Sequence, residues 1–131
     1  MSITRDCRGT TAVQMAIVSL VMIVLFFGII ETGLLIQAQI SLNYAVETAA
    51  RCAAIMGGAK NSPCPTSSAS TIQSYAKAQF VNLSPNVAPT FTYSTPANGC
   101  GQQVSATYPF ASVVNLIPYH VTLSSSACFP S

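Results

Sequence analysis

One stretch near the N-terminus decides the fold: Arg8-Gly9-Thr10-Thr11-Ala12-Val13-Gln14-Met15-Ala16-Ile17-Val18-Ser19-Leu20-Val21-Met22-Ile23-Val24-Leu25-Phe26-Phe27-Gly28-Ile29-Ile30. No charged residue occurs from Ala12 to Ile30. As a helix, this run is about 28 Å long at about 1.5 Å per residue, close to the thickness of the hydrocarbon core of a bilayer. Because a backbone in lipid must satisfy its own hydrogen bonds, the run predicts a membrane-spanning helix.

The helix is expected to continue beyond the membrane. After Glu31 no proline occurs before Pro63, and residues suited to a helix continue to Ala54. The pair Gly57-Gly58 would end the helix, since glycine tolerates the left-handed conformation of a helix cap. We therefore predict one long helix over residues 10–60, which spans the membrane at about 12–33.

Small residues recur every four positions in the second half of this helix. Positions four apart lie on one helix face, and small side chains there let another helix approach closely. Two interpretations stay open at this point, namely packing in a helical assembly and packing against the chain's own small domain. The main row consists of Ala45, Ala49, Ala53 and Gly57, with a neighbouring row at Ala50, Ala54 and Gly58.

Charge near the N-terminus predicts the orientation of the span. Arg5, Asp6 and Arg8 precede it, and the next basic residue is Arg51. By the positive-inside rule the short N-terminal side stays in the cytoplasm and the remainder crosses. A conventional cleaved secretory signal is less favoured, because its apolar region is usually about 7–15 residues and ends at a small-x-small site.

Length and composition limit the possibilities for the rest. The chain has 131 residues, which favours one domain, and only 6% of them are charged. The net charge of +2 is too small and too scattered to indicate nucleic-acid binding. The roughly 70 residues after Lys60 are marginal for an independent core. Disulfides, partners or an assembly are therefore expected to support residues 61–131, the predicted small periplasmic domain.

The segment after Lys60 predicts an α+β domain. A second helix is expected from about Ala69 to Leu83, capped by Ser68 or Ser70, because its apolar residues recur at three- and four-residue steps. Alternating polar and apolar residues then predict strands over 90–93, 104–108 and 121–124. The predicted fold is a long membrane-spanning helix, a second short helix and a small antiparallel three-stranded sheet, with the second helix on the sheet's apolar face.

Five cysteines need an explanation. Cys7 precedes the span, whereas Cys52, Cys64, Cys100 and Cys128 would lie in an oxidising periplasm. Four cysteines allow three pairings; locality favours Cys52–Cys64 and Cys100–Cys128. In regular strands Cys100 and Cys128 would lie on opposite faces, although a bulge at Gly99 or Gly101 could redirect Cys100.

Catalysis and metal binding find little support in the sequence. Aspartate and glutamate total three. His120 stands alone between Tyr119 and Val121, no cysteine pair has CxxC spacing, and no phosphate loop or serine-nucleophile motif occurs. We predict no enzymatic activity, no metal and no cofactor.

The N-terminal residues carry a family resemblance. Arg8-Gly9-Thr10-Thr11-Ala12-Val13-Gln14-Met15-Ala16, Gly28-Ile29-Ile30-Glu31-Thr32-Gly33 and Ala45-Val46-Glu47-Thr48-Ala49-Ala50-Arg51 resemble TadE-like minor pilins, or pseudopilins, of the tight adherence (Tad/Flp) branch of type IV pilus systems. The resemblance is specific over the first 51 residues and looser beyond about Cys64.

The resemblance implies a processing site and docking residues. In that family a membrane prepilin peptidase cuts after the glycine, which corresponds here to the Gly9–Thr10 bond and makes residues 1–9 a cytoplasmic leader. The family normally has glutamate as the fifth residue after the cut, where this chain has Gln14. Thr10 and Gln14 would then dock subunits. Glu31 is either a further subunit contact or a carboxylate at the outer membrane interface.

The resemblance also implies a function and partners. The chain is expected to be a minor pilin in the bacterial inner membrane that joins or primes a Tad filament with other major and minor pilins and the assembly platform. An uncleaved single-span anchor that carries a small periplasmic binding domain is the alternative. The N-terminus of the mature protein separates the two.

Overall fold

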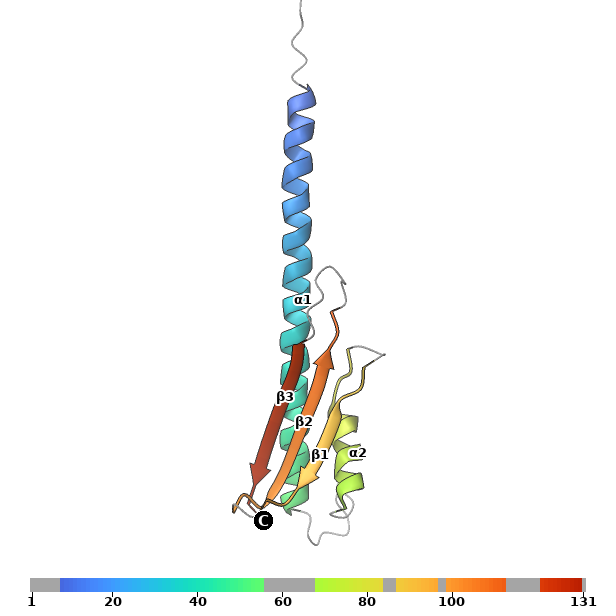
Figure 1. The fold of residues 1–131 in the computed structure, drawn as a ribbon, viewed down its shortest axis with the longest axis vertical. Coiled ribbons are helices and arrows are strands. Elements are labelled where there is room, and N and C mark those ends of the chain that lie inside the picture. Colours follow the sequence, from blue (N-terminus) through green and yellow to red (C-terminus); the bar gives the residue numbers. More distant parts are fainter. Residues whose placement is uncertain (1–7, 56–67, 84–86, 97–98, 113–120, 131) are drawn as a thin grey trace, which may run out of the picture.

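A computed structural model of the chain describes residues 8–55, 68–83, 87–96, 99–112 and 121–130 (Figure 1). The elements follow in the order α1 (Arg8–Ile55), α2 (Ala69–Gln79), β1 (Thr90–Ser94), β2 (Gln102–Phe110) and β3 (Val121–Phe129). This confirms the predicted fold, a long N-terminal apolar helix, a second short helix and a three-stranded antiparallel sheet.

Helix α1 is 48 residues long, or about 72 Å, and has two unlike halves. Every side chain over residues 11–30, here called the bare half, is exposed. Over residues 34–55, the covered half, one face is buried beneath the sheet and α2, which gather around the C-terminal part of the helix in Figure 1. The predicted end at Gly57-Gly58 lies outside the described residues.

Helix α2 is shorter than predicted because the chain turns to meet α1. The prediction extended it to Leu83, but Phe80 adopts an extended conformation and ends the helix. The backbone N–H of Val81 then donates to Ser41 Oγ of α1 at 2.9 Å. Ser68 occupies the N-cap position as predicted, although its hydroxyl bonds with Thr71 Oγ1 at 2.6 Å instead of a backbone N–H.

The sheet has the order β1-β2-β3 with both pairs antiparallel. Strands β2 and β3 pair without interruption from Gln102↔Phe129 to Phe110↔Val121, so both are longer than the sequence predicted. The prediction ended β2 before Pro109. Pro109 is tolerated in β2 because the pairing of β2 with β1 stops at Thr107. The N–H that proline lacks is therefore not needed for a hydrogen bond to β1.

The core lies between the apolar face of the sheet and the covered half of α1. Its largest fully buried side chains are Tyr108, Leu42, Val46 and Val104. The rings of Phe80 and Tyr108 lie 5.1 Å apart and tilted, a favourable aromatic arrangement. Helix α2 was predicted to cover the sheet, but it contacts only β1 and α1, while α1 covers β2 and β3. The long helix is therefore itself the main support of the sheet.

Candidate functional site

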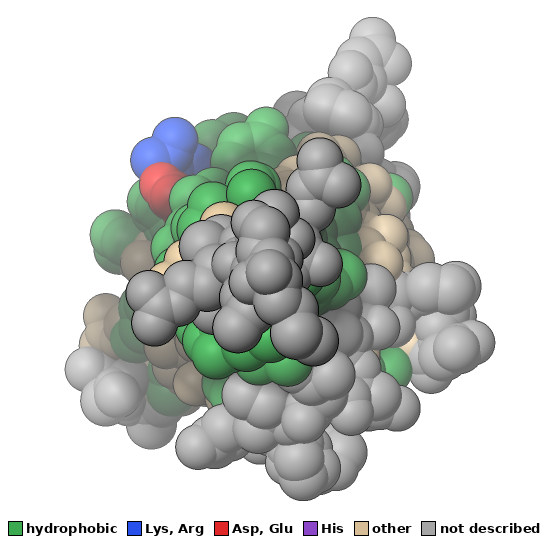
Figure 2. Space-filling model, turned by 90° about the horizontal axis from the view of Figure 1, so that it is seen from above, with side chains coloured by type: hydrophobic (Ala, Val, Ile, Leu, Met, Phe, Trp, Pro, Cys, Tyr) green, Lys and Arg blue, Asp and Glu red, His purple; other side chains and the backbone are tan. Residues whose placement is uncertain are grey.

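The bare half of α1 is the most distinctive surface of the molecule. Its large apolar side chains are all exposed, from 43% for Phe27 to 73% for Met15. Ser19 Oγ donates to Ala16 O at 2.9 Å, and Thr32 Oγ1, just beyond the bare half, donates to Gly28 O at 2.7 Å. These hydroxyls are satisfied by the helix backbone and need no water, which suits a helix in lipid. In Figure 2, viewed from the N-terminal end of α1, the coloured side chains are mainly hydrophobic.

A membrane span is supported by length and composition. Within the part of the chain that the structure describes, one helix, Thr11–Ile55, is long and apolar enough to cross a bilayer. None of the most apolar stretch of this helix is buried, whereas the core helix of a soluble protein is mostly buried. The N-terminal apolar helix thus indicates a membrane or secretion context.

The predicted cleavage residues lie in the first turn of α1. The helix begins at Arg8, and a side chain built at Gly9 would meet no atom within 4 Å. The fold itself therefore does not require glycine at this position. Gln14, one turn further, is exposed, whereas the Thr10 side chain lies outside the described part.

Glu31 lies where the bare half ends. Glu31 is half-buried. Leu34 and Leu35, within one helical turn of it, pack against the core cluster. The position matches both interpretations stated from the sequence, a subunit contact and an interfacial carboxylate.

The small residues of α1 face the chain's own domain. Ala45 and Ala49 are fully buried, Ala53 is nearly so, and all three share one core cluster with Ile72 and Ala76 of α2. Of the two interpretations left open, these positions fit packing within the chain. Gly57 lies outside the described residues.

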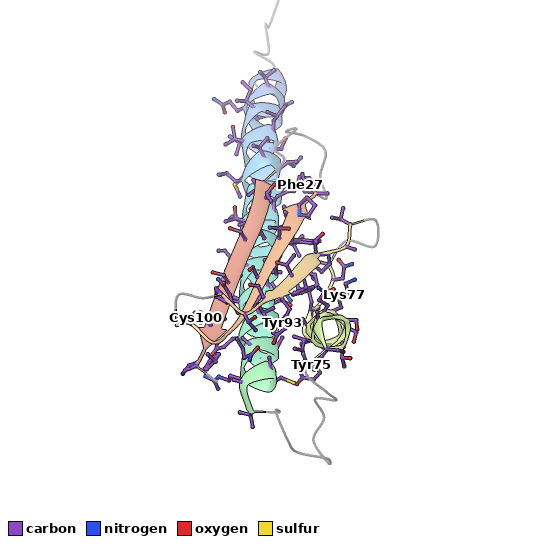
Figure 3. All side chains as sticks on the ribbon, turned by 60° about the horizontal axis from the view of Figure 1, so that its bottom comes forward. Phe27, Tyr75, Lys77, Tyr93 and Cys100 are labelled. Carbon is purple, nitrogen blue, oxygen red and sulfur yellow. A yellow bond between two sulfur atoms is a disulfide. The ribbon has the colours of Figure 1, made fainter. Side chains whose placement is uncertain are left out.

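The Cys100–Cys128 disulfide is formed, as the prediction of pairing by locality required. No bulge is needed, because Cys100 precedes β2 in a turn whose flanking residues Gly99 and Gly101 have φ of 80° and 77°. These left-handed conformations, which glycine adopts readily, free Cys100 from strand alternation so that it meets exposed Cys128 at the end of the sheet (Figure 3).

Cys52 is also disulfide-bonded. Its predicted partner, Cys64, lies outside the described residues. Among the residues that are described, no three His, Cys, Asp or Glu side chains come together to hold a metal ion. His120 lies outside the described residues.

Comparison with known families agrees with the geometry of α1. The family model described as TadE-like protein matches residues 9–51. Residues 9–51 form a TadE-like segment. The resemblance stated from the sequence is thus confirmed over that segment, which contains the bare half and most of the covered half. The matched segment is consistent with a Tad pilus component. Comparison with curated proteins and with solved structures gave no match.

One surface of the TadE-like helix was missed by the sequence analysis. Ile36, Ile40 and Tyr44 are 52%, 63% and 57% exposed on the face of the covered half that points away from the domain. Together with Ile29 and Gly33 they form a row with steps of three and four residues, here called the outer stripe. The spacing was visible in the sequence, but burial of the opposite face was needed to show that the stripe remains uncovered.

Proposed function

We propose that this TadE-like chain is a minor pilin, or pseudopilin, of a Tad-type system. A prepilin peptidase cuts it after Gly9, and the mature chain acts in assembly, priming or tip display of a filament. The single observation that carries the proposal is one uninterrupted helix whose bare half and most of whose covered half fall within the TadE-like segment. In such a helix the bare half contacts the membrane or other subunits, and the covered half carries the domain that is displayed.

The proposed topology places the bare half in the inner membrane. The N-terminus is cytoplasmic by its basic residues, and the sheet with α2 is periplasmic. The disulfide between Cys100 and Cys128 is consistent with that compartment, because disulfides persist where the environment is oxidising. After assembly the domain would be extracellular, beside other major and minor pilins and above the assembly platform.

The proposed roles of the N-terminal residues follow from position and chemistry. Gly9 presents no side chain to a protease, and nothing within the chain requires glycine there. Cleavage would make the amine of Thr10 a terminal cation. Gln14 would offer that amine of a neighbouring subunit a neutral acceptor, which is weaker than the charge-assisted bond of the family's usual glutamate. Glu31 is proposed as a further docking residue.

The test is the N-terminus of the protein purified from the cell envelope. A chain that begins at Thr10 supports the minor pilin, whereas a chain that retains Met1 or Ser2 supports the uncleaved anchor. Gly9→Leu should block cutting and leave a product heavier by the nine-residue leader. Gly28→Leu is the matched control, since it makes the same substitution at another exposed helical glycine and should be processed normally. Normal processing of Gly9→Leu would remove the proposed site.

A further inference from the structure

The two edges of the sheet differ in length and in what lies beside them. Strand β1 has five residues and packs against α2, whereas β3 has nine residues. Figure 1 shows α2 beside β1 at one side of the sheet and β3 at the other side. In the described part of the chain no further strand pairs with β3. A short edge, or one covered by a helix, resists the addition of a strand, so β3 is the more accessible edge.

The direction of the backbone groups on β3 follows from its pairing with β2. In an antiparallel ladder, successive residues direct their N–H and C=O groups alternately toward one neighbour and away from it. Thr122 lies opposite Pro109, which has no N–H to offer β3 within an uninterrupted ladder. Gln39 Nε2 of α1 donates to Ser124 O at 3.3 Å, so this carbonyl also faces away from β2. The backbone groups of Thr122, Ser124 and Ser126 therefore line the free edge.

Strand β3 lacks the features that commonly block a sheet edge. Its sequence, Val121-Thr122-Leu123-Ser124-Ser125-Ser126-Ala127-Cys128-Phe129, contains no charged residue, proline or glycine. It pairs with β2 residue for residue, so no bulge twists the edge away. The side chains of Thr122, Ser124 and Ser126 are exposed. Of the side chains that the structure describes, Gln39 alone donates to the backbone of this edge, and it occupies only the Ser124 carbonyl.

The C-terminal end of β3 is fixed to its neighbours. The Cys100–Cys128 disulfide joins it to the turn before β2. The guanidinium carbon of Arg51 lies 5.3 Å from the centre of the Phe129 ring, which links the same end to α1. An edge that is already ordered loses little conformational entropy when a partner binds.

The hydrogen-bonding pattern of the edge defines the kind of partner. Backbone donors and acceptors that recur at every second residue match the main chain of another extended strand, as in recognition by strand addition. A helix uses its backbone hydrogen bonds internally and cannot offer them to the edge. Since β3 carries no charge, a charged segment finds no counter-charge there.

The direction of pairing favours a different polypeptide over a second copy. Antiparallel pairing is slightly more stable per residue than parallel pairing. Strand β3 runs alongside α1 (Figure 1), so two copies with the same membrane orientation hold their β3 strands parallel to each other. We propose that β3 binds an extended, uncharged segment of another protein as an antiparallel fourth strand of the sheet. The proposal requires neither cleavage after Gly9 nor a filament.

Amide hydrogen exchange in the full-length chain, in mild detergent, tests the edge directly. The amides of Thr122 and Ser126 should exchange faster than that of Ser125, which faces β2. The probe is a synthetic peptide with capped ends and the sequence of residues 121–129 carrying Cys128→Ser, which is uncharged and free of proline. Excess peptide should slow exchange at Thr122 and Ser126. Unchanged exchange at both amides would overturn the proposal.

Two substitutions at one edge position separate backbone pairing from side-chain contact. Ser126→Pro removes an outward N–H and costs no bond to β2, so the fold and the Cys100–Cys128 disulfide should be retained. Peptide affinity should fall about tenfold, because a carbonyl of the peptide loses its donor. Ser126→Ala keeps the N–H and should bind the peptide as the unaltered chain does. Equal affinities for the two variants would refute strand addition.

Chemical blocking of the peptide gives a test that leaves the protein unaltered. Two versions of the peptide carry N-methyl groups on alternate amides, one at the even positions and the other at the odd positions. In an added strand, one set of amides faces β3 and the other faces away from it. One version should therefore lose binding while the other retains it. The same affinity for both versions would contradict pairing through the backbone.

Discussion

The two halves of α1 show how one helix serves two environments. The bare half places apolar side chains on every face, a pattern that suits apolar surroundings. The covered half divides its faces, with alanines and aliphatic side chains beneath the sheet and α2 and a mixed outer face. No break separates them, because neither proline nor a buried glycine interrupts residues 8–55. The difference is therefore one of packing partners, not of backbone conformation.

The largest contrast is expected from removal of a leucine in each half. Leu42→Ala empties a fully buried site in the covered half, and buried leucine-to-alanine changes destabilise by about 3–5 kcal/mol. Leu25→Ala in the bare half removes a half-exposed side chain and leaves no cavity within the chain. Urea unfolding of the full-length protein in detergent, followed by the tyrosine signal of the domain, should show the difference. Similar losses for both variants would mean that the bare half is packed.

Removal of the Cys100–Cys128 disulfide should destabilise the sheet and α2, which cover α1, and leave the bare half unaffected. Cys100→Ser with Cys128→Ser opens a bridge across a sequence separation of 28, and loss of such a bridge costs about 3.6 kcal/mol in the chain-entropy account. The domain should unfold at lower urea, while far-UV circular dichroism retains the signal of the bare half. Non-reducing mass spectrometry of the unaltered protein should show two bonds among Cys52, Cys64, Cys100 and Cys128. Simultaneous loss of all helical signal would contradict the independence of the two halves.

Replacement of an alanine by a larger side chain should also affect the two halves of α1 differently. Ala49→Leu forces a larger side chain beneath the domain, and such overpacking typically costs about 1–3 kcal/mol. Ala16→Leu makes the same substitution on the bare half, where the side chain is exposed and leucine suits lipid. Thermal unfolding of both variants beside the unaltered chain tests this. A domain unaffected by Ala49→Leu would show that the small residues are not needed for packing within the chain.

The smallest effect is expected on the outer face of the covered half. Glu47→Gln removes the charge that pairs with Arg51, but both side chains are more than half exposed. An exposed pair four residues apart contributes about 0.5 kcal/mol or less, and salt screens it. Arg51 also lies 5.3 Å from the centre of the Phe129 ring, a contact that the change leaves in place. Urea unfolding should shift only slightly; a loss above about 1 kcal/mol would reveal a larger role for the pair.

The long helix, the element types and the class of the domain followed from the sequence alone. In lipid, the backbone of the charge-free run from Ala12 to Ile30 must satisfy its own hydrogen bonds, which predicts a helix. After Pro89, polar and apolar residues alternate with a period of two, which predicts strands. The resemblance of residues 8–51 to TadE-like proteins was likewise visible in the sequence. The pairing of Cys100 with Cys128 was favoured by locality, because short loops close easily.

Tertiary structure decided the rest. Phe80 carries a helical pattern, yet it ends α2 because burial against Tyr108 and the bond from Val81 to Ser41 outweigh local preference. Ala45 and Ala49 suit a partner helix and a domain equally well in sequence, and only the folded chain shows what covers them. The outer stripe emerged for the same reason. A periodic pattern shows which residues share a helix face, but which face is buried depends on contacts between residues far apart in the chain.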